Sequence, residues 1–200
     1  FQNLHSSMNI ILLATANGHK LEEFSNILGK EYFIRSLKDY PELPEIEETG
    51  TSLEENAGIK AKTLASHIGN TTIADDSGLI VPVLGGDPGI HSARYAGEHG
   101  NDSANRKLLL QNLEDIHDRS AYFECVIALC NPDGDTLYFS GKLHGHIGFE
   151  EKGSNGFGYD SIFIPEGSDR SLAEFSPEEK NQISHRRKAI DGLLAYLNKI

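Results

Sequence analysis

The chain has 200 residues, of which 38% are hydrophobic and 24% are charged, and its formal net charge is −12. This composition is typical of a globular protein that buries its own core. The negative charge argues against nucleic acid as a partner, because contacts to a phosphate backbone need a basic face.

No apolar run reaches the length of a membrane-spanning helix and the N-terminus lacks a signal-peptide pattern, so we expect no membrane partner. The two cysteines fit a reducing, cytoplasmic location. Cys125 and Cys130 are five residues apart on one predicted strand, so they should point to opposite faces and stay unpaired. We interpret Met8 as the natural start and residues 1–7 as a cloning remnant, which leaves one domain over residues 8–200.

Apolar runs and helical spacings alternate along the chain, and the turn Asn131-Pro-Asp-Gly134 signals a hairpin. The sheet should therefore be mixed rather than purely parallel. Strands are predicted over residues 9–15, 32–36, 71–75, 79–84, 121–130, 136–147 and 160–164. Helices are predicted over residues 19–29, from the capping box Ser52–Glu55 onward, around residues 108–116 and around residues 190–197.

Two adjacent carboxylates, Asp75 and Asp76, follow an apolar run and precede Ser77 and Gly78. Neighbouring side chains point to opposite faces of a strand, so at a strand's end one acid can face a cleft while the other braces the loop. Such a pair suits a hard cation and an activated water. The alternative is an Asx-type turn without chemistry.

An anion site is predicted where the first strand meets the first helix, in the sequence Thr15-Ala-Asn-Gly-His-Lys20. Free N–H groups and the helix dipole favour phosphate there, and Lys20 adds a cation. The segment is not a Walker A loop. A helix cap beside a surface lysine is the alternative interpretation.

The acidic arm over residues 39–50 includes Glu45-Ile-Glu-Glu-Thr-Gly50. It is either a solvated loop or the source of a second carboxylate for Mg²⁺, which binds through one or two carboxylates plus substrate phosphate.

Near the C-terminus, glycines flank an aromatic residue in Gly156-Phe-Gly-Tyr-Asp160. This arrangement suits stacking of a nucleobase on Phe157, with Asp160 fixing an orientation, or else an aromatic plug beneath a loop. Lys180 and Ser184-His-Arg-Arg-Lys188 form a basic stretch that could read an anion or a carbonyl, or simply begin a helix.

In this order, the segments resemble the inosine triphosphate pyrophosphatase family, also called XTP/dITP diphosphatases. The resemblance runs from about residue 9 to the C-terminus. It is carried by Thr15-x-Asn-x-x-Lys20, Glu47-Glu-Thr-Gly50, Glu55-Asn-Ala57 with Lys60, Ala74-Asp-Asp-Ser-Gly-Leu79, Leu84-Gly-Gly-x-Pro-Gly89, Ser92-Ala-Arg-Tyr95, Gly156-Phe-Gly-Tyr-Asp160, Glu179-Lys180 and Ser184-His-Arg186.

The resemblance implies an α/β fold with an elongated mixed sheet, flanking helices and two lobes around a central cleft, and it implies a homodimer. It also implies Mg²⁺-dependent hydrolysis of ITP, dITP and XTP to the monophosphate and pyrophosphate, which removes deaminated purines from the nucleotide pool.

By motif position, the resemblance implies that Asp76 is the general base and a metal ligand. Glu47 would be a further metal ligand, although the sequence leaves the choice between Glu47 and Glu48 open. The implied phosphate-binding residues are Thr15, Ala16, Asn17, Gly18, His19, Lys20, Lys60, Ser77 and Lys180. The implied base- and sugar-binding residues are Phe157, Gly158, Tyr159, Asp160, His185 and Arg186.

Two other functions remain open from the sequence. Maf-like nucleotide pyrophosphatases have a related shape, but they begin with a Ser-rich, Arg-Arg loop that this chain lacks. A non-catalytic nucleotide-binding module is the other alternative, and it would bind ITP without turning it over.

Overall fold

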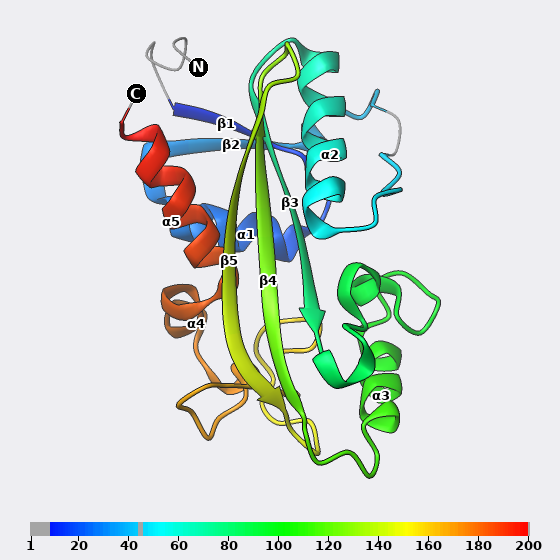
Figure 1. The fold of residues 1–200 in the computed structure, drawn as a ribbon. Helices are drawn as coiled ribbons and strands as arrows, with labels where there is room; N and C mark the ends of the chain where they lie inside the picture. The colour runs from blue at the N-terminus through cyan, green and yellow to red at the C-terminus, as the bar shows by residue number, and fades with distance from the viewer. Residues whose placement is uncertain (1–8, 44–45, 200) are drawn as a thin grey trace. The chain divides into compact units, whose positions relative to one another are not determined.

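A computed structural model describes residues 9–43 and 46–199, so the predictions for residues 1–8 and for Glu45 lie outside the described residues. Figure 1 shows the elements in chain order. The helices are α1 (Gly18–Leu28), α2 (Leu53–Ile68), α3 (Asp102–Asn112), α4 (Pro177–Ile183) and α5 (His185–Leu197). The strands are β1 (Asn9–Leu13), β2 (Tyr32–Ser36), β3 (Thr72–Ile80), β4 (Ser120–Cys130), β5 (Thr136–Ile147) and β6 (Phe163–Pro165).

The described strands form a six-stranded sheet in the order β2-β1-β3-β4-β5-β6. Strand β1 is parallel to β2 and β3, whereas β5 is antiparallel to β6. The short turn between β4 and β5 closes with a bond from the Asn131 N–H to the Asp135 carbonyl, 3.0 Å long. The predicted α/β fold with a mixed sheet is therefore confirmed.

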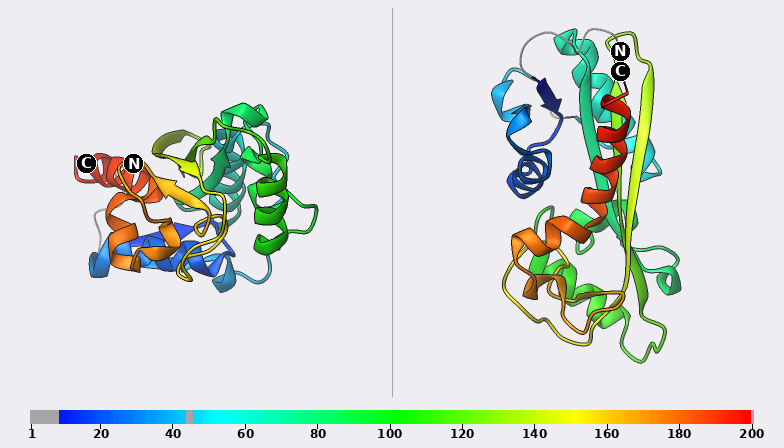
Figure 2. Two further views of the ribbon diagram at one scale, coloured as in Figure 1. Left: turned by 90° about the horizontal axis from the view of Figure 1, so that it is seen from below. Right: turned by 90° about the vertical axis from the view of Figure 1, so that its left-hand side faces the viewer.

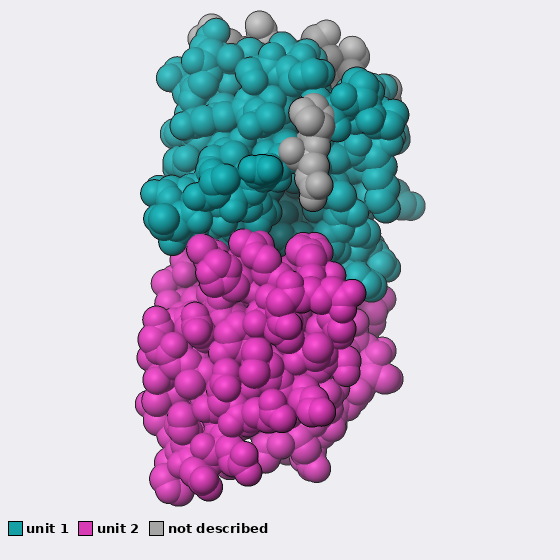
Figure 3. Space-filling view, turned by 90° about the vertical axis from the view of Figure 1, so that its right-hand side faces the viewer, with its two compact units in different colours: residues 1–76, 125–141, 186–200 teal, residues 77–124, 142–185 magenta. Residues whose placement is uncertain are grey.

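The chain divides into two compact units, which Figure 3 distinguishes by colour. Unit 1 contains the described parts of residues 1–76, 125–141 and 186–200, and unit 2 contains residues 77–124 and 142–185. Strands β3, β4 and β5 each contribute residues to both units. Among the described residues, no helix is both long and apolar enough to span a membrane.

Each unit has its own hydrophobic core. In unit 1, α1 and α5 pack on the sheet, and Figures 1 and 2 show α5 running alongside the β4–β5 hairpin. This core includes Leu13, Phe24, Ile127 and Ile190. Cys125 and Cys130 are both buried, and no disulfide joins them, as predicted.

In unit 2, residues of α3, β4, β5 and β6 belong to one hydrophobic cluster. The buried residues of this core are Leu79, Val81, Leu109, Leu113, Ala121, Phe123, Leu143, Ile147, Tyr159, Ile162, Phe163 and Leu172. The core supports the segment 153–162, which leads into β6.

The predicted break between two strands around the acidic pair is wrong, because β3 is continuous from Thr72 to Ile80. The Ser-Gly pair does not turn the chain. Gly78 instead allows a close backbone approach, since a Cβ there would lie 2.3 Å from the Gly89 carbonyl oxygen. Asp75 and Asp76 therefore lie within a strand and not at its end.

Two smaller predictions also change. The last strand is Phe163–Pro165, and Asp160 lies before it because its carboxylate accepts the Phe157 N–H at 2.9 Å and stabilises a turn. Ser52 caps α2 as predicted, but the Glu55 carboxylate binds the Thr51 N–H, so the reciprocal bond of a capping box is replaced. Helix α4 was not predicted.

Candidate active site

The acidic pair of β3 has two different environments within unit 1. The Asp75 side chain is fully buried, and its Oδ2 lies 3.0 Å from Lys20 Nζ and 3.4 Å from Arg186 Nη2. Burial alone would raise the pKa of Asp75, but Lys20, Arg186 and Lys60 together hold it well below its usual range. Asp75 is therefore a permanent negative charge and a poor proton acceptor.

Asp76 points to a different set of charges. Lys60 Nζ lies 3.4 Å from Asp76 Oδ1 and 2.7 Å from Glu48 Oε1. Burial raises the pKa of Asp76, and the nearby Lys60 and Lys20 only partly oppose this effect. A carboxylate with a raised pKa accepts a proton more readily, so Asp76 suits the predicted role of general base.

Lys60 remains charged between these acids. Burial would lower its pKa, but the negative charges of Asp76, Asp75 and Glu48 raise it overall. Lys60 is contributed by α2, whose N-terminus is capped by the Ser52 hydroxyl. One ammonium group thus joins the acidic pair to the acidic arm.

The acidic arm is held against α2 at its C-terminal end. The Gly50 N–H donates to Asn56 Oδ1 at 2.8 Å, and Asn56 is fully buried. Glu48 contacts Lys60, whereas Glu47 is exposed. Of the two glutamates that the sequence left open, Glu48 is the one that the structure brings to Lys60.

The loop before α1 has the geometry of a helix cap. Asn17 Oδ1 accepts the N–H groups of His19 at 3.0 Å and Lys20 at 3.2 Å, and Thr15 Oγ1 accepts the Asn17 N–H at 3.1 Å. Ala16, Gly18 and His19 are exposed. The cap is confirmed, and phosphate binding by this loop stays a prediction.

Arg186 lies among carboxylates in unit 1. Its guanidinium is almost fully buried and pairs with Glu23 as well as with Asp75. Burial would lower its pKa, but Glu23 and Asp75 raise it. Its predicted contact with the base stays a prediction. Glu23 was missed, although its position three residues after Lys20 on α1 places both on one helix face.

A second cluster lies in unit 2, around the Gly-rich loop. Lys180 Nζ lies 2.7 Å from Asp160 Oδ2 and 4.7 Å from the centre of the Phe157 ring. Gly156 must be glycine, because a Cβ would lie 2.1 Å from Asp160 Oδ2 and its φ is +74°. The loop is therefore shaped by its own aspartate and by Lys180 from α4.

The neighbouring predicted residues are largely buried. Tyr159 is part of the core, its hydroxyl donates to the Ser92 carbonyl at 2.9 Å, and burial raises its pKa. His185 is also buried, and its ring stacks on Phe123 with the centroids 4.9 Å apart. Ser77 is half-buried on β3.

Within residues 9–43 and 46–199, no group of three or more His, Cys, Asp or Glu side chains could hold a metal ion. The donors that the structure does bring near one ammonium group are the two carboxylates of Glu48 and Asp76. Two carboxylates fit a Mg²⁺ ion that arrives with the phosphates of a substrate, because such an ion keeps few protein ligands.

Comparisons with known proteins agree over nearly the whole chain. A dITP/XTP pyrophosphatase of Bacillus licheniformis is 48% identical over 195 residues, which cover 96% of this chain and 100% of that protein. A dITP/XTP pyrophosphatase of Oceanobacillus iheyensis is 47% identical over 202 residues, with coverage of 96% and 100%.

Solved structures show the same fold. The Staphylococcus aureus Ham1 protein superposes with a TM-score of 0.87 at 44% identity, covering 95% of this chain and 98% of that one. A HAM1 protein from Coxiella burnetii gives a TM-score of 0.88 at 41% identity, with coverage of 96% and 99%. A model of the Ham1 family matches residues 11–196, and the chain therefore belongs to the Ham1 family.

Proposed function

We propose that this protein hydrolyses deaminated purine nucleoside triphosphates, namely dITP, XTP and ITP, to the monophosphate and pyrophosphate. Its relatives at 46–48% identity are named dITP/XTP pyrophosphatases. The observation that carries the proposal is the split environment of the acidic pair. Asp75 pairs with Lys20 and Arg186, whereas Asp76 lies beside Lys60, which also contacts Glu48.

In the proposed reaction, Asp76 accepts a proton from a water that attacks the α-phosphorus. The bond from the α-phosphorus to the bridging oxygen breaks, and pyrophosphate leaves. Lys20 and Lys60 are the cations of unit 1 that would neutralise charge on the phosphates. By its position in the sequence motifs, Lys180 is a further proposed phosphate-binding residue.

The proposed cofactor is Mg²⁺, held by Asp76 and Glu48. When bound, it would neutralise the phosphates and acidify a water. The support for Glu48 over Glu47 is the pair that Glu48 forms with Lys60, which also contacts Asp76. We further propose a homodimer in the cytoplasm.

Base selection would rest on hydrogen-bond donors aimed at the 6-keto group. ATP has an amino group at that position, so buried donors would lose their partner, and such a mismatch discriminates strongly. We propose His185 and Arg186 as these donors and Phe157 as the surface on which the ring stacks. The support is their position in the sequence motifs, and for Phe157 the cation that borders its ring.

The proposal is tested by the turnover of ITP, dITP, XTP, ATP and GTP, each with Mg²⁺ and with a chelator. We expect the three deaminated nucleotides to be preferred and the chelator to abolish turnover. Binding of ITP without turnover would instead identify a non-catalytic nucleotide-binding protein. Preference for a modified pyrimidine nucleotide would support a Maf-like activity.

A further inference from the structure

One residue of the Gly-rich loop, Gly158, is held by α3 through both its backbone N–H and its backbone carbonyl. The Gly158 N–H donates to Asp102 Oδ2 at 2.8 Å, and the Gly158 carbonyl accepts from Arg106 Nη1 at 2.8 Å. Asp102 and Arg106 are four residues apart and therefore lie on one face of the helix. Both bonds involve a charged side chain, which makes them stronger than neutral ones.

Arg106, which holds the Gly158 carbonyl, has a second partner. Arg106 Nε lies 2.9 Å from Glu151 Oε2, so a carboxylate from the segment between β5 and β6 forms an ion pair with the guanidinium. Gly158 has a φ of +62°, in the left-handed region that glycine tolerates. The loop thus adopts a conformation that depends on partners from outside its own sequence.

Phe157 precedes Gly158, and its main chain is held by a separate hydrogen bond. Its N–H donates to Asp160 Oδ2, which also binds Lys180. With the Phe157 N–H and both polar atoms of Gly158 fixed, the main chain on either side of the aromatic ring has little freedom. The position of the ring is therefore set from α3, α4 and Asp160 together.

We propose that Asp102 and Arg106 are positioning residues that set the affinity for the purine base by fixing the loop that carries Phe157. The inference rests on the proposed function, in which Phe157 stacks on the base. Neither residue would touch the substrate. Their effect would act through Phe157 and would not reach the phosphate groups.

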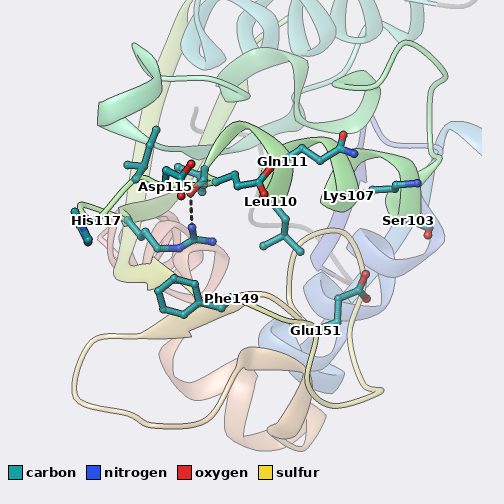
Figure 4. Close-up of a pocket in the computed structure, with 12 residues that line it drawn as sticks. Ser103, Lys107, Leu110, Gln111, Asp115, His117, Phe149 and Glu151 are labelled. Atoms are coloured by element: carbon teal, nitrogen blue, oxygen red, sulfur yellow. Dashed lines mark hydrogen bonds between the residues drawn. The ribbon is translucent and has the colours of Figure 1, made fainter.

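Lys107 supplies a matched control on the same helix. It is exposed, and it lines an open cavity of about 840 Å³ in unit 2 together with Ser103, Leu110, Gln111 and Glu151 (Figure 4). Lys107→Met removes a positive charge one residue from Arg106 without removing a bond to the loop.

The experiment compares Asp102→Ala, Arg106→Met and Lys107→Met by hydrogen exchange of residues 153–162 and by KM and kcat for ITP. Competitive inhibition by inorganic pyrophosphate is measured in parallel. We expect faster exchange and a KM raised about tenfold in the first two variants, as for loss of a charged hydrogen bond. Pyrophosphate inhibition should be unchanged, and Lys107→Met should match the unmodified protein in every measurement.

Two further variants separate positioning from general support of the fold. Asp102→Asn keeps an acceptor for the Gly158 N–H, so it should restore most of the affinity lost in Asp102→Ala. In a Phe157→Ala background, Asp102→Ala should raise KM by less than about twofold, because residues that act through one another are not additive.

An unchanged KM in Asp102→Ala and Arg106→Met would overturn the inference, and so would an equal loss of pyrophosphate inhibition. A full additional loss in the Phe157→Ala background would also overturn it. The proposed function fails by a different result, namely no turnover of ITP, dITP or XTP by the unmodified protein. In that case, hydrogen exchange still tests whether Asp102 and Arg106 hold the loop at Gly158.

Discussion

At the scale of single residues, the acidic pair of β3 divides two tasks between neighbours. Asp75 is surrounded by cations and contributes a fixed charge, whereas Asp76 lies in a site that favours its protonated form. The alternation of a strand makes this possible, because adjacent side chains leave the sheet on opposite faces. Substitutions of Asp75 and of Asp76 should therefore have opposite effects on the stability of the protein.

The first prediction concerns the stability of the two asparagine variants in metal-free buffer at neutral pH. Asp75→Asn leaves Lys20 without its carboxylate partner and leaves Arg186 with Glu23 alone, so it should lower the free energy of unfolding by about 3 kcal/mol. Asp76→Asn removes a charge that burial disfavours, so it should leave the melting temperature unchanged or raise it.

The pH dependence of stability supplies the control. The lowered pKa of Asp75 contributes stability above its unfolded value of about 3.9, and this contribution is lost as the pH falls through the folded value. The difference between the unmodified protein and Asp75→Asn should therefore shrink in acid. An equal loss of stability in both variants would contradict the division of tasks.

The second prediction concerns the acid limb of the rate profile. Lys60 is the cation that most opposes the raised pKa of Asp76. Lys60→Met should therefore move the acid limb of kcat/KM for ITP to higher pH, whatever its effect on the maximum rate. The control is Lys62→Met, which removes an exposed charge from the same helix. A limb that stays in place or moves to lower pH would show that another group is the base.

Much of the unit 1 site could be predicted from local sequence. The acids, the cap at Asn17 and the lysines Lys20 and Lys60 all belong to short motifs. Local sequence places Glu23 on the same face of α1 as Lys20, but it could not predict the pair with Arg186, which lies 163 residues away and meets Glu23 only after α1 and α5 pack on the sheet. The role of Gly78 was also hidden, since Ser-Gly is a turn signal unless another backbone approaches.

At the scale of elements, two helices position proposed functional residues, α2 in unit 1 and α4 in unit 2. The acidic arm is tied to α2 by the bond from the Gly50 N–H to Asn56 Oδ1. Lys180 is carried by α4, a helix of seven residues whose start is fixed by a complete capping box between Ser176 and Glu179. The sequence Ser-Pro-Glu-Glu was the signal for α4. Pro is favoured in the first turn of a helix, and the second Glu follows Ser by three residues, as a capping box requires.

The third prediction concerns the acidic arm. Asn56→Leu removes the acceptor of the Gly50 N–H and should raise the Mg²⁺ concentration for half-maximal activity, because Glu48 is then less well placed. Mn²⁺ binding followed by paramagnetic resonance provides a measurement that does not depend on turnover. Glu54→Gln serves as the control, being an exposed residue of the same helix turn. Unchanged metal affinity in Asn56→Leu would show that the arm does not hold the ion.

The fourth prediction concerns α4. Ser176→Ala should lower the free energy of unfolding by about 1 kcal/mol, because the cap accepts an otherwise unpaired helix N–H. It should also raise KM for ITP, since Lys180 and the Asp160 turn depend on α4. Ser168→Ala is a matched control for thermal melting, because it removes a serine hydroxyl that accepts the Arg170 N–H outside α4. An unchanged KM after loss of the cap would show that α4 does not contribute to substrate binding.

At the scale of the whole molecule, the mixed sheet was predictable from the hairpin signal and from the alternation of strands and helices. The division into two units was not, because β3, β4 and β5 each serve both of them. No local pattern marks the point in a continuous strand where one core ends and another begins. The homodimer remains a proposal, and sedimentation of the unmodified protein would test it.

The products formed from ITP test the central claim most directly. The measurement follows a single incubation with Mg²⁺ and resolves inosine mono- and diphosphate, pyrophosphate and orthophosphate over the first turnovers. We predict equal amounts of inosine monophosphate and pyrophosphate, with Asp76→Asn losing at least about a hundredfold in rate, as expected for a positioned general base. Inosine diphosphate and orthophosphate as the first products would contradict the account.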